Sequence, residues 1–133
     1  MPQPNDEDEA IEILYHGTTL NVALQILAVR KFDLQATFFS SVRELAVYFS
    51  HRSRERQKRP SNPAVLRIPV CRSDLLDWRR GRLVASKGFD EMDKLELRGK
   101  TQLIFSPEAV RLLNTYSFAD EWALEPVESA GLY

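Results

Sequence analysis

The chain has 133 residues, 44% of them hydrophobic, and its 18 Lys+Arg nearly balance its 19 Asp+Glu. This composition excludes a disordered chain and predicts one globular domain with a single core. The lone cysteine, Cys71, excludes an internal disulfide, and its spacing from His16 and His51 is unlike that of zinc ligands, so we expect no metal. No apolar run approaches the roughly 20 residues that cross a bilayer, and the first residues are acidic rather than basic and apolar. We therefore expect a cytoplasmic protein without a membrane partner.

Charge is segregated along the chain although the total is only −1. Residues 1–29 hold five acidic and no basic residues, residues 51–82 hold ten Lys/Arg against three Asp/Glu, and residues 108–133 hold one Arg against five acidic residues. The three local net charges are therefore −5, +7 and −4. The basic middle segment predicts a surface that attracts a polyanion, even though the whole molecule is nearly neutral.

Hydrophobic spacing and turn residues divide the chain into short strands and helices. Runs of Val, Ile, Leu and Phe indicate strands, and apolar residues three and four positions apart behind a capping residue indicate helices. In chain order we expect a strand at 11–15 that ends at Gly17, a helix at 20–30 behind Thr18 and Thr19, a strand at 37–39, a helix from a Ser41–Glu44 capping box into 51–59, a strand at 64–70, a helical turn at 74–79 capped by Ser73, strands at 83–85, 95–97 and 102–105, and a helical turn or edge strand at 107–113.

The order of these elements lacks the regular alternation of strand and helix that marks a doubly wound sheet. It favours one compact α+β domain, which we expect at residues 10–118. Residues 1–9 predict a mobile acidic leader, because they hold Pro, Asn and acids with nothing to bury. Residues 119–133 are expected to be an acidic C-terminal tail.

Two residues offer nucleophile or acid–base chemistry, and each has a simpler structural interpretation. His16 follows a predicted strand and precedes a glycine that lets a ligand approach the backbone, but a turn histidine bonded to nearby backbone is the commoner case. Cys71 is expected to be a small buried residue, although a Cys71–His16 nucleophilic pair stays open. The sequence contains no serine-hydrolase, P-loop or Rossmann motif.

The charged run at 51–59 fits either a solvated helix end or a patch that faces phosphate groups. His51 within it is expected to be a solvated surface residue. Tyr48, just before the run, belongs to the core by default, but its ring and hydroxyl also suit a flat heterocycle. The candidate patch residues are Arg52, Arg54, Arg56, Lys58 and Arg59.

Three segments carry a family resemblance: LYHGTT at Leu14–Thr19, TFFSS at Thr37–Ser41, and ELAVY at Glu44–Tyr48. At this spacing the set resembles the ADP-ribosyltransferase superfamily. It is most similar to the branch shared with poly(ADP-ribose) polymerases and diphtheria-type toxins, whose signature is a His, a Tyr and a late Glu on separate strands. The similarity extends over residues 11–113. It implies a single domain with a split, mostly antiparallel β core and two main helices, and NAD as the substrate.

The resemblance implies specific roles for several side chains. His16 would hydrogen-bond the ribose of the nicotinamide half of NAD, the Gly17 backbone would pair with the carboxamide, and Tyr48 would stack on the nicotinamide ring. Phe38 stands where the family commonly has a tyrosine, so that wall keeps an aromatic face and loses a hydroxyl. The implied NAD-binding set is Tyr15, His16, Gly17, Thr18, Phe38, Phe39, Ser40 and Tyr48.

The late strand of the resemblance matches Thr101–Phe105, which puts Gln102 where the family usually has glutamate. A carboxylate there would stabilise the positive charge that develops as nicotinamide leaves, whereas a neutral amide orients the ribose without adding a full charge. His16 and Gln102 are thus the implied catalytic residues. Glu96 and Glu108 fit the spacing less well.

As a whole the resemblance implies a mono-ADP-ribosyltransferase of the small toxin or effector type. Its partners would be NAD, a protein or nucleic-acid acceptor, and an antitoxin or other regulatory protein. Two alternatives stay open. One is a catalytically silent fold relative that binds a protein or nucleic acid through residues 51–82, and the other is an RNA 2′-phosphotransferase-like enzyme, for which the chain is short.

Overall fold

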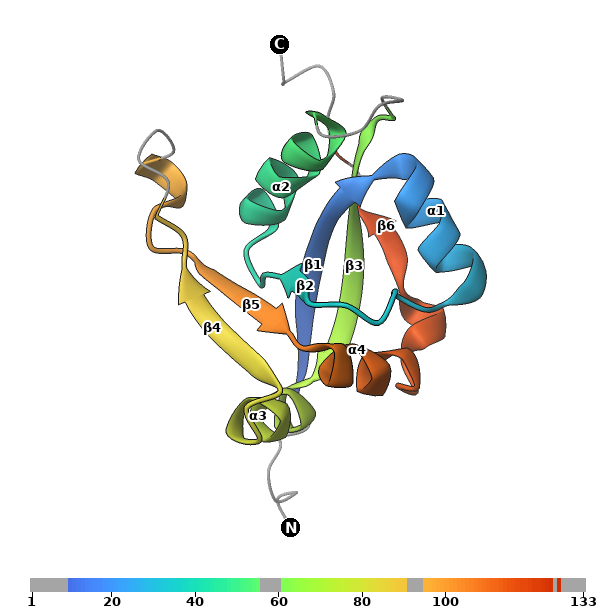
Figure 1. The fold of residues 1–133 in the computed structure, drawn as a ribbon, viewed down its shortest axis with the longest axis vertical. Coiled ribbons are helices and arrows are strands. Elements are labelled where there is room, and N and C mark those ends of the chain that lie inside the picture. The colour runs from blue at the N-terminus through green and yellow to red at the C-terminus, as the bar shows by residue number, and fades with distance from the viewer. Residues whose placement is uncertain (1–9, 56–60, 91–94, 126, 128–133) are drawn as a thin grey trace.

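A computed structural model describes residues 10–55, 61–90, 95–125 and 127, so the leader expected at 1–9 lies outside the described residues. The elements are shown in Figure 1. In chain order they are β1 (Ile11–Thr19), α1 (Leu20–Val29), β2 (Thr37–Phe39), α2 (Arg43–Glu55), β3 (Pro63–Cys71), α3 (Arg72–Arg80), β4 (Val84–Gly88), the 3₁₀ turn η1 (Leu95–Leu97), β5 (Thr101–Phe105), α4 (Pro107–Asn114), the 3₁₀ turn η2 (Ala119–Glu121) and β6 (Ala123–Glu125).

The strands form two antiparallel three-stranded sheets, ordered β1-β3-β6 and β2-β5-β4. The expected α+β class with a split antiparallel β core is thereby confirmed. Helices α1 and α2 correspond to the two main helices, and α3 and α4 add two shorter ones. None of the described helices combines the length and the apolar content needed to cross a bilayer.

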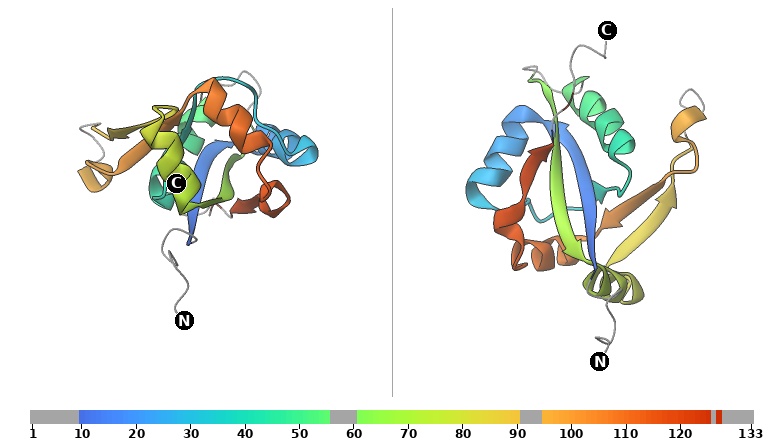
Figure 2. Two further views of the ribbon diagram at one scale, coloured as in Figure 1. Left: turned by 90° about the horizontal axis from the view of Figure 1, so that it is seen from below. Right: turned by 180° about the vertical axis from the view of Figure 1, so that it is seen from behind.

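Among the described residues, backbone hydrogen bonds join the two sheets at one residue pair, after which the sheets separate. The Tyr15 amide donates to the Ser40 carbonyl at 2.7 Å, and the Ser40 amide donates to the Tyr15 carbonyl at 2.9 Å. Beyond this pair β1 continues along β3, while the β4–β5 hairpin extends away from the first sheet (Figures 1 and 2). The edge of β1 after Tyr15 is therefore left without a neighbouring strand.

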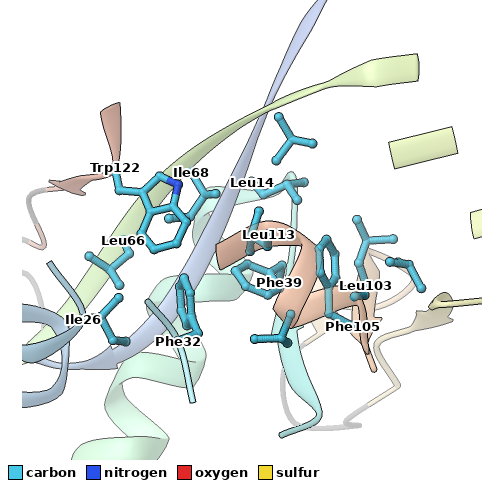
Figure 3. Close-up of a cluster of buried hydrophobic side chains, with 14 of the residues drawn as sticks. Leu14, Ile26, Phe32, Phe39, Leu66, Ile68, Leu103, Phe105, Leu113 and Trp122 are labelled. Atoms are coloured by element: carbon cyan, nitrogen blue, oxygen red, sulfur yellow. The ribbon is translucent and has the colours of Figure 1, made fainter. Parts of the chain in front are cut away.

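The main core lies between the first sheet, α1, α4 and the inner face of the second sheet. Leu14, Ile68, Phe105 and Leu113 are fully buried in it, and Figure 3 shows these side chains converging from four elements. Each large apolar side chain removed from water contributes about 1.5–3 kcal/mol before entropy is counted. The sequence supplies these residues at alternate positions of the strands, which fixes the face that each strand turns inward.

Helix α2 covers the opposite face of the first sheet, and Gly17 makes this packing possible. A Cβ atom built on Gly17 would lie 1.9 Å from the Ala46 carbonyl oxygen and 2.7 Å from the Ser50 amide nitrogen. Only glycine lets the helix backbone approach the strand so closely. Val65, the partner of Gly17 in β3, shares this face and is fully buried, whereas its neighbour Leu66 is buried in the main core on the other face, so the sheet is covered on both faces here.

Several expected local features are wrong. Strand β1 does not end at Gly17 but runs to Thr19, because its pairing with β3 continues through Thr19 and Pro63. Neither Thr19 nor Ser73 caps a helix with its side chain, since Thr19 makes no cap bond and α3 already begins at Arg72. Helix α2 starts at Arg43, so Ser41 lies outside the N-cap position. Leu95–Leu97 is a 3₁₀ turn, not a strand.

Residues 119–125, expected to belong to the acidic tail, are part of the folded domain. Trp122 is only 2% exposed and packs 5.1 Å from the Phe32 ring. Strand β6 pairs with β3, and Glu125 forms an ion pair with Arg43 of α2 at 3.1 Å. The segment is acidic in composition, but it contains one large apolar residue, Trp122. Burial of that side chain is enough to hold a short edge strand in place.

Candidate functional site

A cavity of about 200 Å³ opens where the two sheets separate. We name it the Phe49 cavity, after the α2 residue on its wall. Seven of the eight residues that the resemblance assigned to NAD binding line it, and Tyr48 does not. The complete lining is Tyr15, His16, Gly17, Thr18, Phe38, Phe39, Ser40, Ala46, Phe49, Arg52 and Ser53.

The backbone of Gly17 faces the open edge of β1. Tyr15 uses both its amide and its carbonyl toward Ser40, away from β3, and in an antiparallel ladder every second residue points the same way. The N–H and C=O of Gly17 therefore also point away from β3. No described residue bonds them across this edge. They form an adjacent donor and acceptor at the cavity, which is the pairing that a carboxamide requires.

His16 is a neutral, oriented ring between the two cavities of this region. Its Nδ1 lies 2.7 Å from the Phe38 carbonyl oxygen, which can only accept, so Nδ1 carries the proton and Nε2 is left as an acceptor. The ring also packs 5.3 Å from the rings of Phe32 and Phe39. Burial lowers the pKa of His16 below the ordinary histidine range, and the Phe38 bond only partly opposes this. The structure thus combines the two interpretations of His16, because the backbone bond fixes a ring that still lines the cavity.

The aromatic wall of the cavity consists of Phe38 and Phe49. Phe38 is 47% exposed, and its ring stacks on that of Phe49 with centroids 6.3 Å apart and planes inclined by 21°. A large apolar ring left exposed at a cavity is a candidate contact for a flat ligand. The sequence interpretation missed Phe49, because the resemblance directed attention to the neighbouring tyrosine.

Tyr48 lies on a different side of α2 and packs in the small second core. Its ring makes edge contacts with Phe89 at 5.2 Å and with Phe49 at 5.4 Å. Its hydroxyl accepts from the Arg52 guanidinium at 3.3 Å, and the same guanidinium lies 5.9 Å from the centre of the Tyr48 ring. Tyr48 therefore orients Arg52, which does line the cavity, rather than lining the cavity itself.

Gln102 is buried on the outer face of β5. Leu103 and Phe105 point into the main core, so the alternation of the strand puts Gln102 on the opposite face, together with Ile104. Phe38 pairs with Ile104 in register and shares that face. Gln102 is 8% exposed and does not line the Phe49 cavity, but it lies on the same side of the sheet as the cavity's aromatic wall.

A second cavity, of about 240 Å³, adjoins the first and shares His16, Thr18 and Phe38 with it. We name it the Lys31 cavity. Its lining is more polar and includes Gln25, Lys31, Asp33 and Gln35 from α1 and the loop that follows. Together the two cavities form a cleft in the size range of small-molecule sites, about 300–1,000 Å³.

The basic segment 51–82 does not form one surface. The nine residues of strand β3 span roughly 30 Å, so the C-terminal end of α2 and helix α3 lie at opposite ends of the strand (Figure 1). Of the expected patch, only the Arg52 side chain is described. Arg54 lies on α2 without a described side chain, and Arg56, Lys58 and Arg59 lie outside the described residues. His51 is partly buried, with Nε2 inaccessible, rather than solvated.

A Cys71–His16 pair is excluded by the strand register. Cys71 pairs with Ile11, five residues from His16 along β1, which corresponds to roughly 17 Å. Cys71 is a partly exposed thiol whose Sγ lies 3.6 Å from the Ser73 hydroxyl. Within the described part of the chain no three His, Cys, Asp or Glu side chains come close enough to hold a metal ion.

Comparisons with known proteins add no relative. No protein-family model matches the chain, and neither the curated proteins nor the solved structures gave a significant match.

Proposed function

We propose that the chain is an NAD-dependent mono-ADP-ribosyltransferase of the ADP-ribosyltransferase superfamily, with NAD in the cleft between the two sheets. One observation carries the proposal. Seven residues chosen from sequence motifs more than 20 positions apart line a single cavity at the point where the sheets separate. These seven residues form two short runs, 15–18 and 38–40, and the fold brings both runs to one cavity.

The chemistry of the cleft suits the nicotinamide half of NAD in the Phe49 cavity. The free N–H and C=O of Gly17 match the carbonyl and amino groups of a carboxamide, and Phe38 and Phe49 supply apolar faces for the ring. The acceptor nitrogen of His16 suits a ribose hydroxyl. The Lys31 cavity then receives the other end of the molecule, with a cation for the diphosphate.

In the reaction, the bond between ribose C1′ and the nicotinamide nitrogen breaks, and its electron pair leaves with nicotinamide. An acceptor oxygen or nitrogen then bonds to C1′ and loses its proton to solvent. The groups beside the proposed ribose position are neutral: the imidazole of His16 and the backbone dipoles of Gly17. The amide of Gln102, which the resemblance assigns to the ribose, is neutral as well and lies outside the lining of both cavities. These neutral groups can hold the ribose in the reactive geometry, but they add no full negative charge opposite the developing cation.

Gln102 is also the feature that favours the second candidate, a catalytically silent relative that binds a protein or nucleic acid. A missing carboxylate costs several kcal/mol of transition-state stabilisation, which corresponds to tens-fold to thousands-fold in rate. Mono-transfer with slow turnover is compatible with such a site, and elongation of a chain is not. The acceptor, a cytoplasmic location and a toxin or effector role with an antitoxin partner remain parts of this proposal.

The test measures release of free nicotinamide from NAD by the wild type, His16→Ala and Gln102→Glu, together with NAD affinity by calorimetry. We expect the wild type to release nicotinamide above the His16→Ala background, and Gln102→Glu to release it faster. If the wild type binds NAD but only Gln102→Glu releases nicotinamide, the silent alternative is correct. If no variant binds NAD, both the substrate assignment and the family assignment fail.

A further inference from the structure

Helix α3 carries a face of arginines at the opposite end of β3 from the cleft. Arg72 and Arg79 are seven residues apart, so they lie almost in line along the helix, and Arg80 is beside Arg79. Arg82 follows directly after the helix. All four side chains are exposed, and we name this set the arginine face.

The arginine face has little internal compensation. Asp74 lies on another side of the helix, where it accepts a short hydrogen bond from the Tyr116 hydroxyl. Asp77 pairs with Arg80 at 3.8 Å, but both side chains are 70% or more exposed, so the pair is weak. Within the described part of the chain Arg72, Arg79 and Arg82 have no acidic partner. A shallow depression between α3 and β4, lined by Leu76, Arg79, Arg80, Val84 and Ser86, extends this surface.

Ala10, the first described residue, lies beside the start of α3. The Arg72 amide donates to the Ala10 carbonyl at 2.9 Å, so Ala10 lies next to the first residue of α3. Figures 1 and 2 show the beginning of β1 next to α3 in every view. The four residues before Ala10 are Asp6, Glu7, Asp8 and Glu9, all acidic.

The acidic segment Asp6–Glu9 matches the arginine face in length and in charge. Four residues of extended chain reach up to about 14 Å, and the nine residues of α3 span roughly the same distance. Four acidic residues directly precede Ala10 in the sequence, and Ala10 lies at one end of a face that carries four arginines. The acidic C-terminal segment is less well placed, because Glu125 pairs with Val65, six residues or about 20 Å from the end of β3 where α3 begins.

We propose that the arginine face binds Asp6–Glu9 of the same molecule. The leader then covers a surface that would otherwise attract polyanions, and it does so at a high effective concentration because it is tethered through Ala10. The binding is electrostatic and partly solvated, so it weakens steeply with salt. Any phosphate polymer that uses this face must displace the leader.

The experiment compares ¹H–¹⁵N spectra of the full chain with those of a neutral-leader variant, Asp6→Asn/Glu7→Gln/Asp8→Asn/Glu9→Gln. We expect the Nε–H signals of Arg79, Arg80 and Arg82 to shift, and the same shifts to appear in the wild type at about 0.5 M NaCl, where the screening length falls to roughly 4 Å. The matched control neutralises four exposed acids elsewhere: Glu96, Glu108, Asp120 and Glu121. It changes the net charge equally and should leave these signals in place.

Shifts confined to residues 10, 11 and 72, or equal shifts in the control variant, would show only proximity or a general field and overturn the proposal. A single-stranded oligothymidylate probes the competing occupant. We expect the neutral-leader variant to bind it about tenfold more tightly than the wild type, with a smaller gain in the control. Equal affinity of the wild type and the neutral-leader variant would mean that nucleic acid, and not the leader, is what this face accepts.

Discussion

Replacing Gly17 with alanine should loosen the attachment of α2 to the first sheet. The added Cβ would lie 1.9 Å from the Ala46 carbonyl oxygen and 2.7 Å from the Ser50 amide nitrogen. Both are backbone atoms of a helix, so no side-chain rotation relieves the clash and the helix itself must move. Phe49 and Arg52 move with it, because they lie on the same helix and line the cavity.

The expected cost is about 3 kcal/mol, the upper part of the range for one extra carbon in a packed interior, since rigid atoms are displaced. For a domain of this size that corresponds to a fall in Tm of roughly 10 °C. Urea unfolding followed by circular dichroism measures the free energy of unfolding directly. Under the proposed function the same substitution also weakens NAD binding, measured by calorimetry well below the Tm.

Gly88→Ala is the matched control, because a Cβ there meets nothing within 4 Å. Its free energy of unfolding should stay within about 1 kcal/mol of the wild type. If Gly17→Ala has the same free energy of unfolding as Gly88→Ala, the backbone of α2 does not pack directly on β1 at this position, and close packing is not the reason for a glycine here.

Four further substitutions probe the site and the fold. His16→Gln should remove a pH dependence of the free energy of unfolding. Burial depresses the pKa of His16, so the unfolded state binds more protons and the wild type loses stability as the pH falls below about 6.5. The variant should lack this loss, and urea titrations at several pH values will measure it. Lys31→Met keeps the aliphatic stem and should weaken NAD roughly tenfold in calorimetry while leaving nicotinamide affinity unchanged, and an equal loss for both ligands would contradict a role in binding phosphate. Tyr116→Phe leaves the Cys71 amide and Asp74 without their partner and should cost about 1–2 kcal/mol in urea unfolding, whereas a neutral result would mean that water replaces the hydroxyl. Trp122→Ala should lower the free energy of unfolding by about 3–5 kcal/mol in urea unfolding. A loss below about 1 kcal/mol would mean that residues 119–125 are a tail and not part of the folded domain.

The sequence predicted the elements whose signal is local and strong. The strand at Thr37–Phe39, the helix at 20–30 and the strand at 64–70, which the structure extends to Pro63–Cys71, all carry apolar residues at the spacing of their structure. The second helix was expected from the Ser41–Glu44 box and begins at Arg43. The sequence also indicated that a glycine is required at position 17, but it did not indicate the physical reason. We expect from the sequence that this glycine lets a ligand approach the backbone. The structure shows that its Cα faces helix α2, whereas its peptide groups face the cavity.

Features that depend on long-range packing could not be predicted. Tyr48 and Phe49 are adjacent aromatic residues, and helical periodicity separates them by about 100°, so which of them faces the cavity depends on the rotation of α2 against β1. That rotation is set by Gly17 and Ala46, 29 residues apart in sequence. Strand β6 was missed for a similar reason, since its three residues become a strand only by pairing with β3 and by the anchor of Trp122.

The burial of Gln102 bears on why a neutral amide stands at this position. A carboxylate at 8% exposure without a close cation would be raised in pKa by desolvation, and part of its benefit would be lost to protonation. Lys87, its register partner on β4, is exposed to solvent and supplies only a screened charge. An amide avoids that cost and still offers a donor and an acceptor. The groups proposed to act on the ribose are thus neutral, because the His16 ring is also uncharged, whereas the charged side chains Arg52 and Lys31 line other parts of the cleft. Neutral groups orient the ribose well while stabilising a cation weakly. This combination favours tight NAD binding with slow, single transfers over rapid turnover.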